Sequence, residues 1–201
     1  MNKNTMIKPC DPEELRQIRI LSGLDAAALR KIVRCVEVES YDKGQSILLE
    51  RQLDSMVLLI LTGKIRLSRK MSVHRQIVIE ELAQGDYFAN SGDIPFLDDS
   101  ISIAASAHCK IGFMPEVVFR SFLLQNPEMT LQHLQKLTRL LRGLNTRMKD
   151  AMFLDARSRI QKTLMEFVVK TSRGAHIPDL PTHAEIASRA DTQREVVSRE
   201  M

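Results

Sequence analysis

Between residues 36 and 115, short hydrophobic runs alternate with turn-forming residues. Ile65 and Leu67 alternate with polar neighbours, and an aliphatic run over residues 56–61 ends at a turn around Gly63. Many short runs at fairly regular spacing are typical of the strands of a β-sandwich or barrel. We therefore expect a β jelly-roll domain in this part of the chain. The expected strand segments are residues 47–49, 56–61, 65–67, 77–82, 101–105 and 111–113.

Helical patterns flank the predicted jelly roll on both sides. On its N-terminal side, Asp11 and Asp25 are suited to cap two short helices, because a carboxylate accepts hydrogen bonds from unpaired backbone N–H groups. From Pro115 onward we expect helices alone, starting with a short one that ends near Leu124. A later helix is predicted over residues 156–171. Its apolar face would consist of Ile160, Leu164, Phe167 and Val168.

A hydrophobic seam predicts a long helix after Asn126-Pro127. Apolar residues recur there at alternating spacings of three and four over nearly three heptads, which is the pattern of a coiled coil. We interpret the seam as the contact between two copies of the chain. The alternative is a long amphipathic helix that packs only on its own domain. The predicted seam residues are Leu134, Leu137, Leu141, Leu144, Met148 and Ala151.

Near its C-terminal end, the chain has the residue spacing of a helix-turn-helix. Thr182 and Glu185 form a capping box that would begin the first of the two helices. Ile186 and Val197 would point into the angle between the helices, and Asp191 tolerates the conformation of a tight turn. A last helix is expected from Gln193 onward.

The second helix of this motif carries side chains that suit the major groove of DNA. Arginine can bind the O6 and N7 atoms of guanine with two hydrogen bonds, and glutamate can accept from N4 of cytosine. Arg194, Glu195 and Arg199 are therefore the predicted base readers, while Gln193 and Ser198 are suited to phosphate contacts. The alternative is an ordinary charged helix face. The complete predicted DNA-binding set is Thr182, Gln193, Arg194, Glu195, Ser198 and Arg199.

Several motifs occur in the same order as in a known family. They are Gly63-Lys64-Ile65, Gly85-Asp86-Tyr87-Phe88, Asn126-Pro127, Phe153-Leu154-Asp155-x-x-x-Arg159-Ile160 and the helix-turn-helix. In these motifs the chain resembles the CRP/FNR superfamily of transcription regulators over almost its whole length. The resemblance implies that Arg194, Glu195 and Arg199 read a TGTGA-like half-site and that a homodimer binds a palindromic operator in double-stranded DNA. RNA polymerase is a further candidate partner.

The resemblance also implies a fold class and a division into domains. We expect an α+β chain with N-terminal helices (1–35), a β jelly-roll sensor domain of the cyclic-nucleotide-binding type (36–125), a dimerisation helix (126–154) and a helix-turn-helix domain (155–201). Relatives continue through a β-hairpin wing, whereas this chain stops at Met201 inside the recognition helix. We therefore expect the winged helix-turn-helix to be truncated. Binding in the sensor domain would repack the long helix and re-aim the two recognition helices.

The predicted effector pocket departs from the family pattern for cyclic AMP. In cyclic-AMP-binding relatives, a glutamate holds the ribose and an arginine neutralises the cyclic phosphate; these positions fall here on Asn90 and on Asp99 or Ser100. Leu144 and Asn145 stand where Thr-Ser would touch the purine. We expect that cyclic AMP does not bind in the usual way. The predicted pocket residues are Phe88, Ala89, Asn90, Ser91, Asp99, Ser100, Leu144 and Asn145.

Charge in this segment strengthens the expectation. No lysine or arginine occurs between Asp86 and Cys109, a stretch that also contains Asp93, Asp98 and Asp99. A phosphate brought within about 4 Å of an unpaired carboxylate would be repelled by about 1–4 kcal/mol, depending on solvation. A basic side chain from elsewhere, such as Arg66 or Arg75, would be needed to rescue a phosphate site. The effector stays unknown: cyclic di-GMP, a small apolar or acidic metabolite, and no ligand at all remain open.

Composition excludes other classes of protein. The longest aliphatic run has six residues, far short of the roughly 20 that span a bilayer, and the N-terminus lacks a secretory signal, so we expect a cytoplasmic protein. Three scattered cysteines cannot supply the four thiolates of an iron–sulfur cluster. A cupin-type enzyme would need paired histidines, and only His74 and His108 lie in the sensor region, so we expect no enzyme. The main alternative is a ligand-sensing or interaction module of the same fold that binds no DNA. The net charge of +4 permits nucleic-acid binding without showing it.

Overall fold

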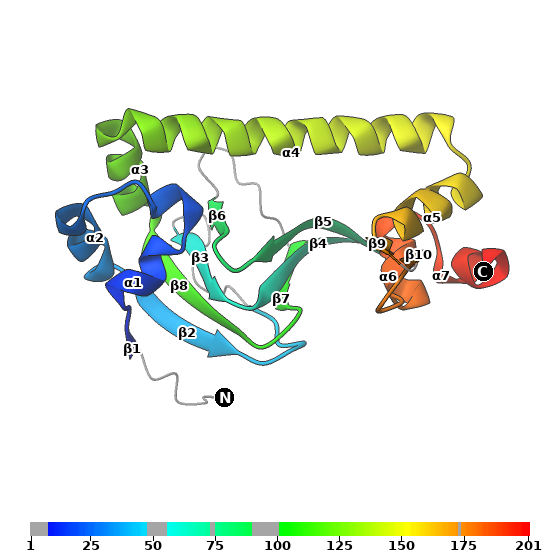
Figure 1. Ribbon diagram of the computed structural model, residues 1–201, viewed down its shortest axis with the longest axis horizontal. Helices are drawn as coiled ribbons and strands as arrows, with labels where there is room; N and C mark the ends of the chain where they lie inside the picture. Colours follow the sequence, from blue (N-terminus) through cyan, green and yellow to red (C-terminus); the bar gives the residue numbers. More distant parts are fainter. Residues whose placement is uncertain (1–7, 48–55, 73–74, 90–100, 173) are drawn as a thin grey trace. The chain divides into compact units, whose positions relative to one another are not determined.

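The computed structural model describes residues 8–47, 56–72, 75–89, 101–172 and 174–201, which form two compact units. The first unit contains Met1–Arg69 and Ile79–Lys136, and the second contains Lys70–Val78 and Leu137–Met201 (Figure 1). The division falls within the long helix rather than at its end. The four-segment domain division expected from the sequence stays a prediction.

Short helices lie before most of the strands, as the capping residues predicted. The side chain of Asp11 accepts from the backbone N–H of Glu13 at 2.9 Å, and that of Asp25 accepts from Ala28 at 2.7 Å. Both carboxylates satisfy N–H groups that the first turn of a helix leaves without partners. The elements of this segment are β1 (Lys8–Pro9), α1 (Pro12–Arg16), η1 (Arg19–Leu21) and α2 (Ala26–Val33).

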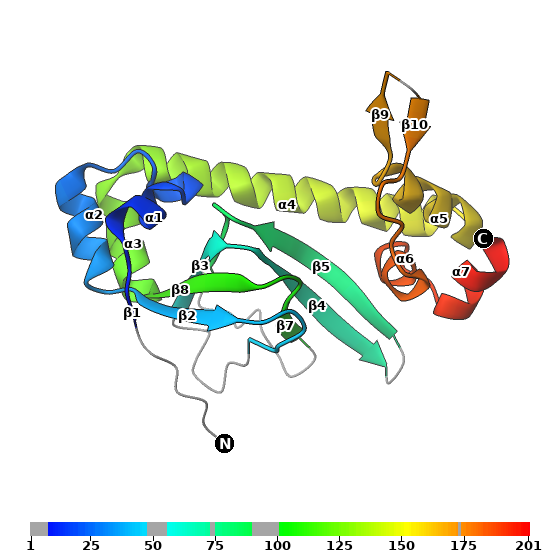
Figure 2. The same ribbon diagram turned by 60° about the horizontal axis from the view of Figure 1, so that its bottom comes forward.

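The described strands between residues 8 and 115 form two antiparallel sheets rather than a closed barrel. One sheet has the order β1-β2-β8-β3-β6, and the other has the order β5-β4-β7 (Figure 2). Of the predicted run 47–49, Ile47 bonds to Ile103 without forming a strand, and the other two residues lie outside the described residues. The strands are β2 (Glu37–Tyr41), β3 (Met56–Thr62), β4 (Lys64–Ser72), β5 (Arg75–Ala83), β6 (Tyr87–Ala89), β7 (Ile101–Ala105) and β8 (Cys109–Pro115).

The turn between β3 and β4 depends on Gly63. Its φ is +78°, in the left-handed region, and a Cβ at this position would lie 2.2 Å from the carbonyl oxygen of His108. Such an approach is far shorter than a van der Waals contact, so the backbone of His108 can pass here only if residue 63 is glycine. The Gly63-Lys64-Ile65 motif therefore has a packing reason.

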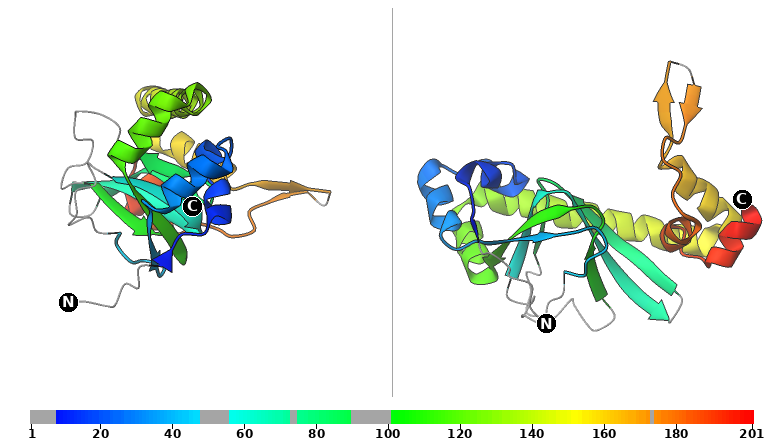
Figure 3. Two further views of the ribbon diagram at one scale, coloured as in Figure 1. Left: turned by 90° about the vertical axis from the view of Figure 1, so that its left-hand side faces the viewer. Right: turned by 90° about the horizontal axis from the view of Figure 1, so that it is seen from below.

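The two sheets and the helices enclose two aliphatic cores. The first lies between the N-terminal helices, α3 (Glu116–Gln125) and one face of the larger sheet, and Phe119 is fully buried in it. The second lies between the sheets around Leu58, Ile60 and Phe113. Residues of β3 alternate between the two cores, as the period of a strand requires. Figure 3 shows α1 and α2 beside α3 at one end of the sheets.

Helix α4 (Pro127–Phe153) is a single helix of 27 residues, as the heptad pattern predicted. Only its first turns contribute buried side chains, namely Met129 and His133. No described helix combines the length and the apolar character needed to span a membrane.

The second unit corrects the expectation that helices alone follow Pro115. Helix α5 ends at Met165, and Val169–Thr171 pairs with Gly174–His176 as an antiparallel hairpin. The β-branched residues Val168, Val169 and Thr171 favour extended backbone, and Gly174 has a φ of +121° at the reversal, so the helical spacing of Phe167 and Val168 was misleading. The elements are α5 (Ala156–Met165), β9 (Val169–Thr171), β10 (Gly174–His176), α6 (His183–Arg189) and α7 (Arg194–Glu200).

Candidate nucleic-acid interface and sensor region

Helices α6 and α7 form the helix-turn-helix that the sequence predicted. The hydroxyl of Thr182 caps α6 by accepting from the N–H of Glu185 at 3.2 Å. Ile186 and Val197 are fully buried where the two helices meet. A small core holds the motif together, and it consists of Ile160, Ile186, Ala187, Ala190 and Val197.

The turn between these helices contains one residue in the left-handed region. Asp191 has a φ of +51°, and it is the one described non-glycine residue with positive φ. Aspartate tolerates this conformation better than most residues because its short polar side chain can bond locally. The N–H of Thr192 donates to the carbonyl of Ala187 at 3.0 Å, which closes the turn.

The predicted base readers lie together on α7 and are all exposed. Arg194 and Glu195 occupy its first turn, and Arg199 follows one turn after Glu195. The side chain of Arg199 is 73% exposed and lies 3.7 Å from Glu200, a weak surface ion pair. Among the described residues, no ion pair engages Arg194 or Glu195. Their functional groups are thus available to a ligand.

The predicted phosphate contacts differ in their surroundings. Gln193 is the exposed N-cap residue of α7 and makes no side-chain capping bond. The hydroxyl of Ser198 lies 2.9 Å from Nδ1 of His183, a bond that joins α7 to the start of α6. Sequence reasoning did not single out His183. Its role is visible only once the two helices are packed.

Arg159 is a second residue whose contacts the sequence did not predict. Its guanidinium donates to the carbonyl oxygens of Leu154 (2.7 Å), Ala190 (2.9 Å) and Asp191 (3.3 Å). The preceding Asp155 caps α5 by accepting from the N–H of Ser158 at 2.8 Å. The bonds from Ser158 favour the ionised carboxylate and hold the pKa of Asp155 below its usual range. The motif Asp155-x-x-x-Arg159 is therefore a cap followed by a clamp.

The predicted effector pocket is only partly covered by the described residues. Phe88 is buried between the sheets, and Ala89 pairs with Val57 at the end of β6. Leu144 and Asn145 are exposed on α4 in the second unit. Asn90, Ser91, Asp99 and Ser100 lie outside the described residues, as does His74. These four pocket positions are therefore interpreted from the sequence alone.

The two basic candidates for rescue of a phosphate site differ in their surroundings. Arg66 pairs with Glu81 at 2.8 Å, so a carboxylate already neutralises its charge. The side chain of Arg75 lies outside the described residues. His108, the other histidine of the sensor region, is exposed and pairs with Asp42 at 3.0 Å.

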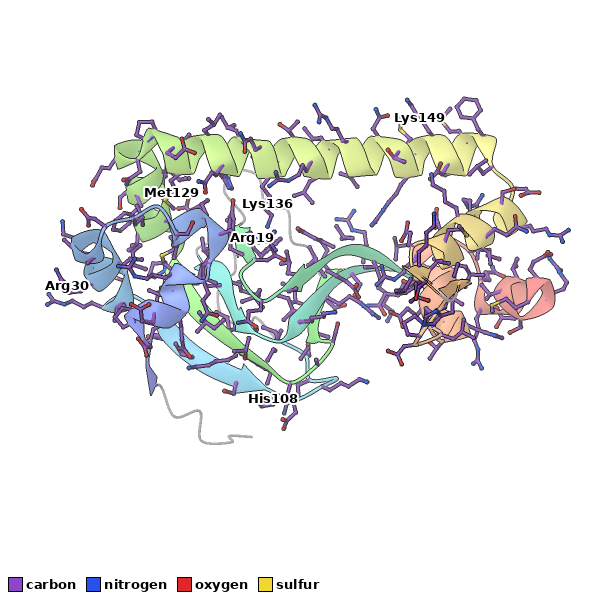
Figure 4. All side chains as sticks on the ribbon, in the orientation of Figure 1. Arg19, Arg30, His108, Met129, Lys136 and Lys149 are labelled. Atoms are coloured by element: carbon purple, nitrogen blue, oxygen red, sulfur yellow. The ribbon has the colours of Figure 1, made fainter. Side chains whose placement is uncertain are left out.

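A buried polar cluster joins β5 and β6 to the first turns of α4 within the first unit. The hydroxyl of Tyr87 lies 2.8 Å from Nδ1 of His133. The ammonium of Lys136 donates to the carbonyl of Tyr87, lies over its ring and forms an ion pair with Glu80 at 3.6 Å. Figure 4 shows Lys136 extending from α4 toward Arg19, which pairs with Asp86 at 2.9 Å.

Burial controls the ionisation of this cluster. It lowers the pKa of His133, with a further lowering from the charge of Lys136. It also lowers the pKa of Lys136 and raises that of Glu80, and the attraction between these two opposes both shifts. Sequence reasoning missed the cluster, because its members are separated by up to 56 residues and each one alone looks ordinary.

The seam predicted on α4 is exposed in the single chain. Leu134 is 54% exposed and Leu141 is 66% exposed, and neither packs into a core cluster of the described residues. Leu137, Leu144, Met148 and Ala151 are exposed as well. A row of half-exposed leucines on one face is unusual for a helix that does not pack against another molecule.

Comparison with known proteins defines the class of the sensor region. A family model for the cyclic nucleotide-binding domain matches residues 38–126. The human cGMP-dependent protein kinase 2 is 33% identical over 91 residues, which is 45% of this chain and 12% of the kinase. Residues 38–126 of the chain thus correspond to a cyclic nucleotide-binding domain.

Similarity to regulators extends over most of the chain. The CRP-like cAMP-activated global transcriptional regulator of Mycobacterium tuberculosis is 24% identical over 195 residues, covering 93% of this chain and 85% of that protein. A CooA mutant from Carboxydothermus hydrogenoformans superposes with a TM-score of 0.72 at 20% identity, covering 96% of this chain and 84% of that one. Together these similarities support the CRP/FNR superfamily as the family of this chain.

Proposed function

We propose that this protein is a homodimeric, sequence-specific DNA-binding transcription regulator whose sensor domain lacks the usual contacts to cyclic AMP. One observation carries the proposal: Arg194, Glu195 and Arg199 are exposed on a single helix that packs against α6 in a helix-turn-helix. The similarity to a mycobacterial transcriptional regulator over 93% of the chain supports it. A regulator of this kind would act in the cytoplasm, with RNA polymerase as a candidate partner.

The side chains on α7 match the chemistry of base edges. Each arginine offers a planar fork that fits O6 and N7 of guanine, and the carboxylate of Glu195 accepts from the amino group of cytosine. Thr182 and Gln193 are the N-cap residues of α6 and α7, and Ser198 lies on α7 itself. Contacts from such positions to phosphates would fix the register of the protein on the duplex. A TGTGA-like half-site contains the G·C pairs that this set requires.

The exposed seam on α4 supports the homodimer. Complete burial of a leucine side chain stabilises a protein by about 1.5–3 kcal/mol, so covering several half-exposed leucines adds up to a substantial driving force. A second copy of the same helix offers the same heptad pattern and fits knobs into holes. Two-fold symmetry would then present two recognition helices to a palindromic operator.

The effector proposed for this chain differs from cyclic AMP. Asn90 replaces the carboxylate that would hold a ribose, and Asp99 or Ser100 replaces the arginine that would hold a phosphate. The aspartates of this segment repel a phosphate monoanion rather than attract it. The mycobacterial relative is named as cAMP-activated. The proposed difference between the two proteins is therefore a difference in binding of cyclic AMP, which can be measured directly.

Two measurements test the proposal. The first is selection of duplexes from a randomised library by the full chain, followed by titration with the selected palindrome and with a shuffled duplex at several salt concentrations. We expect a selected site with TGTGA-like half-sites and a steep dependence of affinity on salt, because phosphate contacts release counterions. The second is calorimetric titration with cyclic AMP, which we expect to give no binding. Selection of no sequence, or tight cyclic-AMP binding, would contradict the corresponding part of the proposal.

A matched pair of variants separates base reading from charge. Arg194→Ala should lower affinity for the selected palindrome by roughly 10- to 100-fold, as expected for loss of one bidentate guanine contact. Arg30→Ala removes the same charge from an exposed position on α2 and should leave the ratio of specific to shuffled affinity unchanged. Equal effects of the two substitutions would argue against base reading by Arg194.

A ligand-sensing module without DNA binding is the second candidate function. The 33% identity to a segment of a cGMP-dependent protein kinase favours it, because there the matched segment is 12% of a protein that is not a transcription regulator. Binding of a ligand by the sensor domain together with failure of the library selection would support this alternative.

A further inference from the structure

One side chain connects the start of α5 to the turn of the helix-turn-helix. The guanidinium of Arg159 donates through Nε to the carbonyl of Ala190 at 2.9 Å and through Nη2 to that of Asp191 at 3.3 Å. Its remaining nitrogen, Nη1, donates to the carbonyl of Leu154 at 2.7 Å, directly after the last residue of α4. All three acceptors are backbone atoms.

We propose that Arg159 is a positioning residue for DNA recognition, which fixes the turn between α6 and α7 and thereby the angle at which α7 is presented. The inference rests on the proposed function, because it assigns how the base-reading helix is held. Arg159 itself carries no predicted contact to DNA. It acts through Ala190 and Asp191, which precede the first base reader, Arg194, by four and three residues.

The turn has a specific need for donors at this place. Ala190 is the C-cap residue of α6, and Asp191 has left-handed backbone, so the chain reverses and turns these two carbonyls out of the regular helical pattern. Carbonyl groups at a helix C-terminus lack intrahelical partners and must bond elsewhere. The fork of Arg159 supplies donors to both, and it does so without displacing the N–H bonds from Ala190 and Thr192 that close the turn.

The apolar contacts that hold α7 are few, which makes this polar contact important. The core beneath the helix-turn-helix has five buried residues, of which α7 contributes Val197, and Val196 of the same helix packs against it partly buried. The ion pair between Arg157 and Glu200 also joins α5 to α7, but the atoms lie 3.7 Å apart and Arg157 is 69% exposed. Such a surface pair adds little to the stability of a protein.

Only arginine can make the three contacts at once. Its planar guanidinium has five N–H donors in a rigid fork, whereas lysine has one compact ammonium on a flexible stem. Arg159→Lys therefore keeps the charge and loses the geometry. Arg157→Lys makes the same exchange two residues away, on the same helix, at an exposed position whose guanidinium pairs with Glu200 at 3.7 Å.

Amide hydrogen exchange of the full chain, without any DNA, measures how often the turn held by Arg159 opens. The reporters are the N–H groups of Ala190 and Thr192, which bond to the carbonyls of Ile186 (2.8 Å) and Ala187 (3.0 Å). In Arg159→Lys we expect both amides to exchange at least about tenfold faster, because the turn opens more often. In Arg157→Lys we expect exchange as in the wild type. Unchanged exchange in Arg159→Lys would overturn the inference.

Titration with duplex DNA measures the consequence for recognition. The probes are the palindrome that the wild type selects from a randomised library and a shuffled duplex of the same length. Arg159→Lys should lose at least roughly tenfold in affinity for the selected palindrome, because misaligned arginines cannot form bidentate contacts. Its affinity for the shuffled duplex and its salt dependence should stay at wild-type values, because the charge is unchanged. Equal loss on both duplexes would contradict a positioning role.

The two readouts distinguish failure of the inference from failure of the proposed function. If the wild type selects no DNA sequence while the amides of Arg159→Lys exchange faster, the proposed DNA-reading function is contradicted. The role of Arg159 in fixing the turn is then still supported. If Arg159→Lys does not fold, Arg159→Gln replaces it: glutamine retains two donors on one nitrogen, and the same acceleration of exchange is expected. Wild-type exchange in the glutamine variant would again overturn the clamp.

Discussion

The hydroxyl of Tyr87 lies 2.8 Å from Nδ1 of His133, and this contact connects strand β6 to the buried face of the first turns of α4. Tyr87 is 5% exposed and His133 is 8% exposed, so both polar groups are removed from water and depend on one another. The strand that carries Tyr87 leads directly into the predicted effector segment. A shift of that strand would therefore displace His133 and the first turns of the long helix.

The first prediction concerns the pH dependence of folding. The pKa of His133 is lowered in the folded protein, so the unfolded chain, with a value near 6.5, binds this proton more readily. The stability that this group contributes is fully present above about pH 6.5 and is lost as the pH falls toward the lowered pKa. The free energy of unfolding should therefore decrease between about pH 7 and pH 5. Urea unfolding at several pH values measures this slope.

A variant pair assigns that slope to His133. His133→Phe removes the titrating group from a site lined by Tyr87 and Lys136, with Glu80 and Asp86 facing Lys136, so the loss of stability between about pH 7 and pH 5 should become smaller. The variant should also lose about 1–3 kcal/mol at pH 7, because the Tyr87 hydroxyl is left without its partner. His108→Gln removes an exposed histidine and serves as the control. An unchanged slope in His133→Phe would show that other groups cause the pH dependence.

The second prediction concerns the ion pair of Lys136 and Glu80. Their side chains are only 17% and 15% exposed, so Lys136→Met leaves a carboxylate buried without its cation. We expect a loss of about 3 kcal/mol, the usual penalty when one member of a buried pair is removed. The double variant Lys136→Met/Glu80→Gln should recover part of this loss, because a neutral amide is easier to bury. Urea unfolding of the four proteins in the cycle gives the coupling energy, and additive effects would contradict the pairing.

The third prediction compares three glycines. Gly63→Ala should destabilise the protein by more than about 2 kcal/mol, because it combines left-handed backbone with an overlap against the carbonyl of His108. Gly44 has a similar φ of +86°, but a Cβ added there would meet nothing within 4 Å, so Gly44→Ala should lose only the conformational part, about 1 kcal/mol. Gly143→Ala lies in α4 with open space around it and should gain up to about 1 kcal/mol. Thermal unfolding ranks the three variants, and any other order would contradict these assignments.

The fourth prediction concerns the seam on α4. Leu141→Glu places a charge in the exposed apolar row and should convert a dimer to a monomer in sedimentation experiments, with loss of binding to a palindromic duplex. Gln135→Glu introduces the same charge at an exposed position outside the row and should leave the dimer intact. A wild-type chain that sediments as a monomer at micromolar concentration would contradict the seam as an interface.

Local signals in the sequence were sufficient where one residue does one local task. Asp11, Asp25 and Thr182 cap the helices for which they were chosen, because an N-cap needs only a side-chain acceptor beside free N–H groups. The heptad pattern predicted α4, since a periodic apolar row is a direct consequence of helical geometry. Ile186 and Val197 were correctly placed in the angle of the helix-turn-helix.

Contacts between distant segments were not predictable in the same way. The helix expected over residues 156–171 ends at Met165, because apolar spacing alone did not distinguish the end of a helix from the start of a hairpin. His133 would pass as an ordinary residue of an amphipathic helix until Tyr87 is placed against it. Arg159 donates to carbonyl oxygens, which every residue possesses and which therefore leave no trace in the sequence.

The same property of Arg159 has a consequence for how such proteins diversify. Because Arg159 bonds to main-chain oxygen atoms, its contacts do not depend on which side chains surround it, as long as the residue at position 191 adopts left-handed backbone. Substitutions at Arg194, Glu195 and Arg199 can then create new operator preferences without rebuilding the scaffold that aims the helix. Proteins that descend from one gene can in this way come to bind different operators while they keep the same helix-turn-helix scaffold.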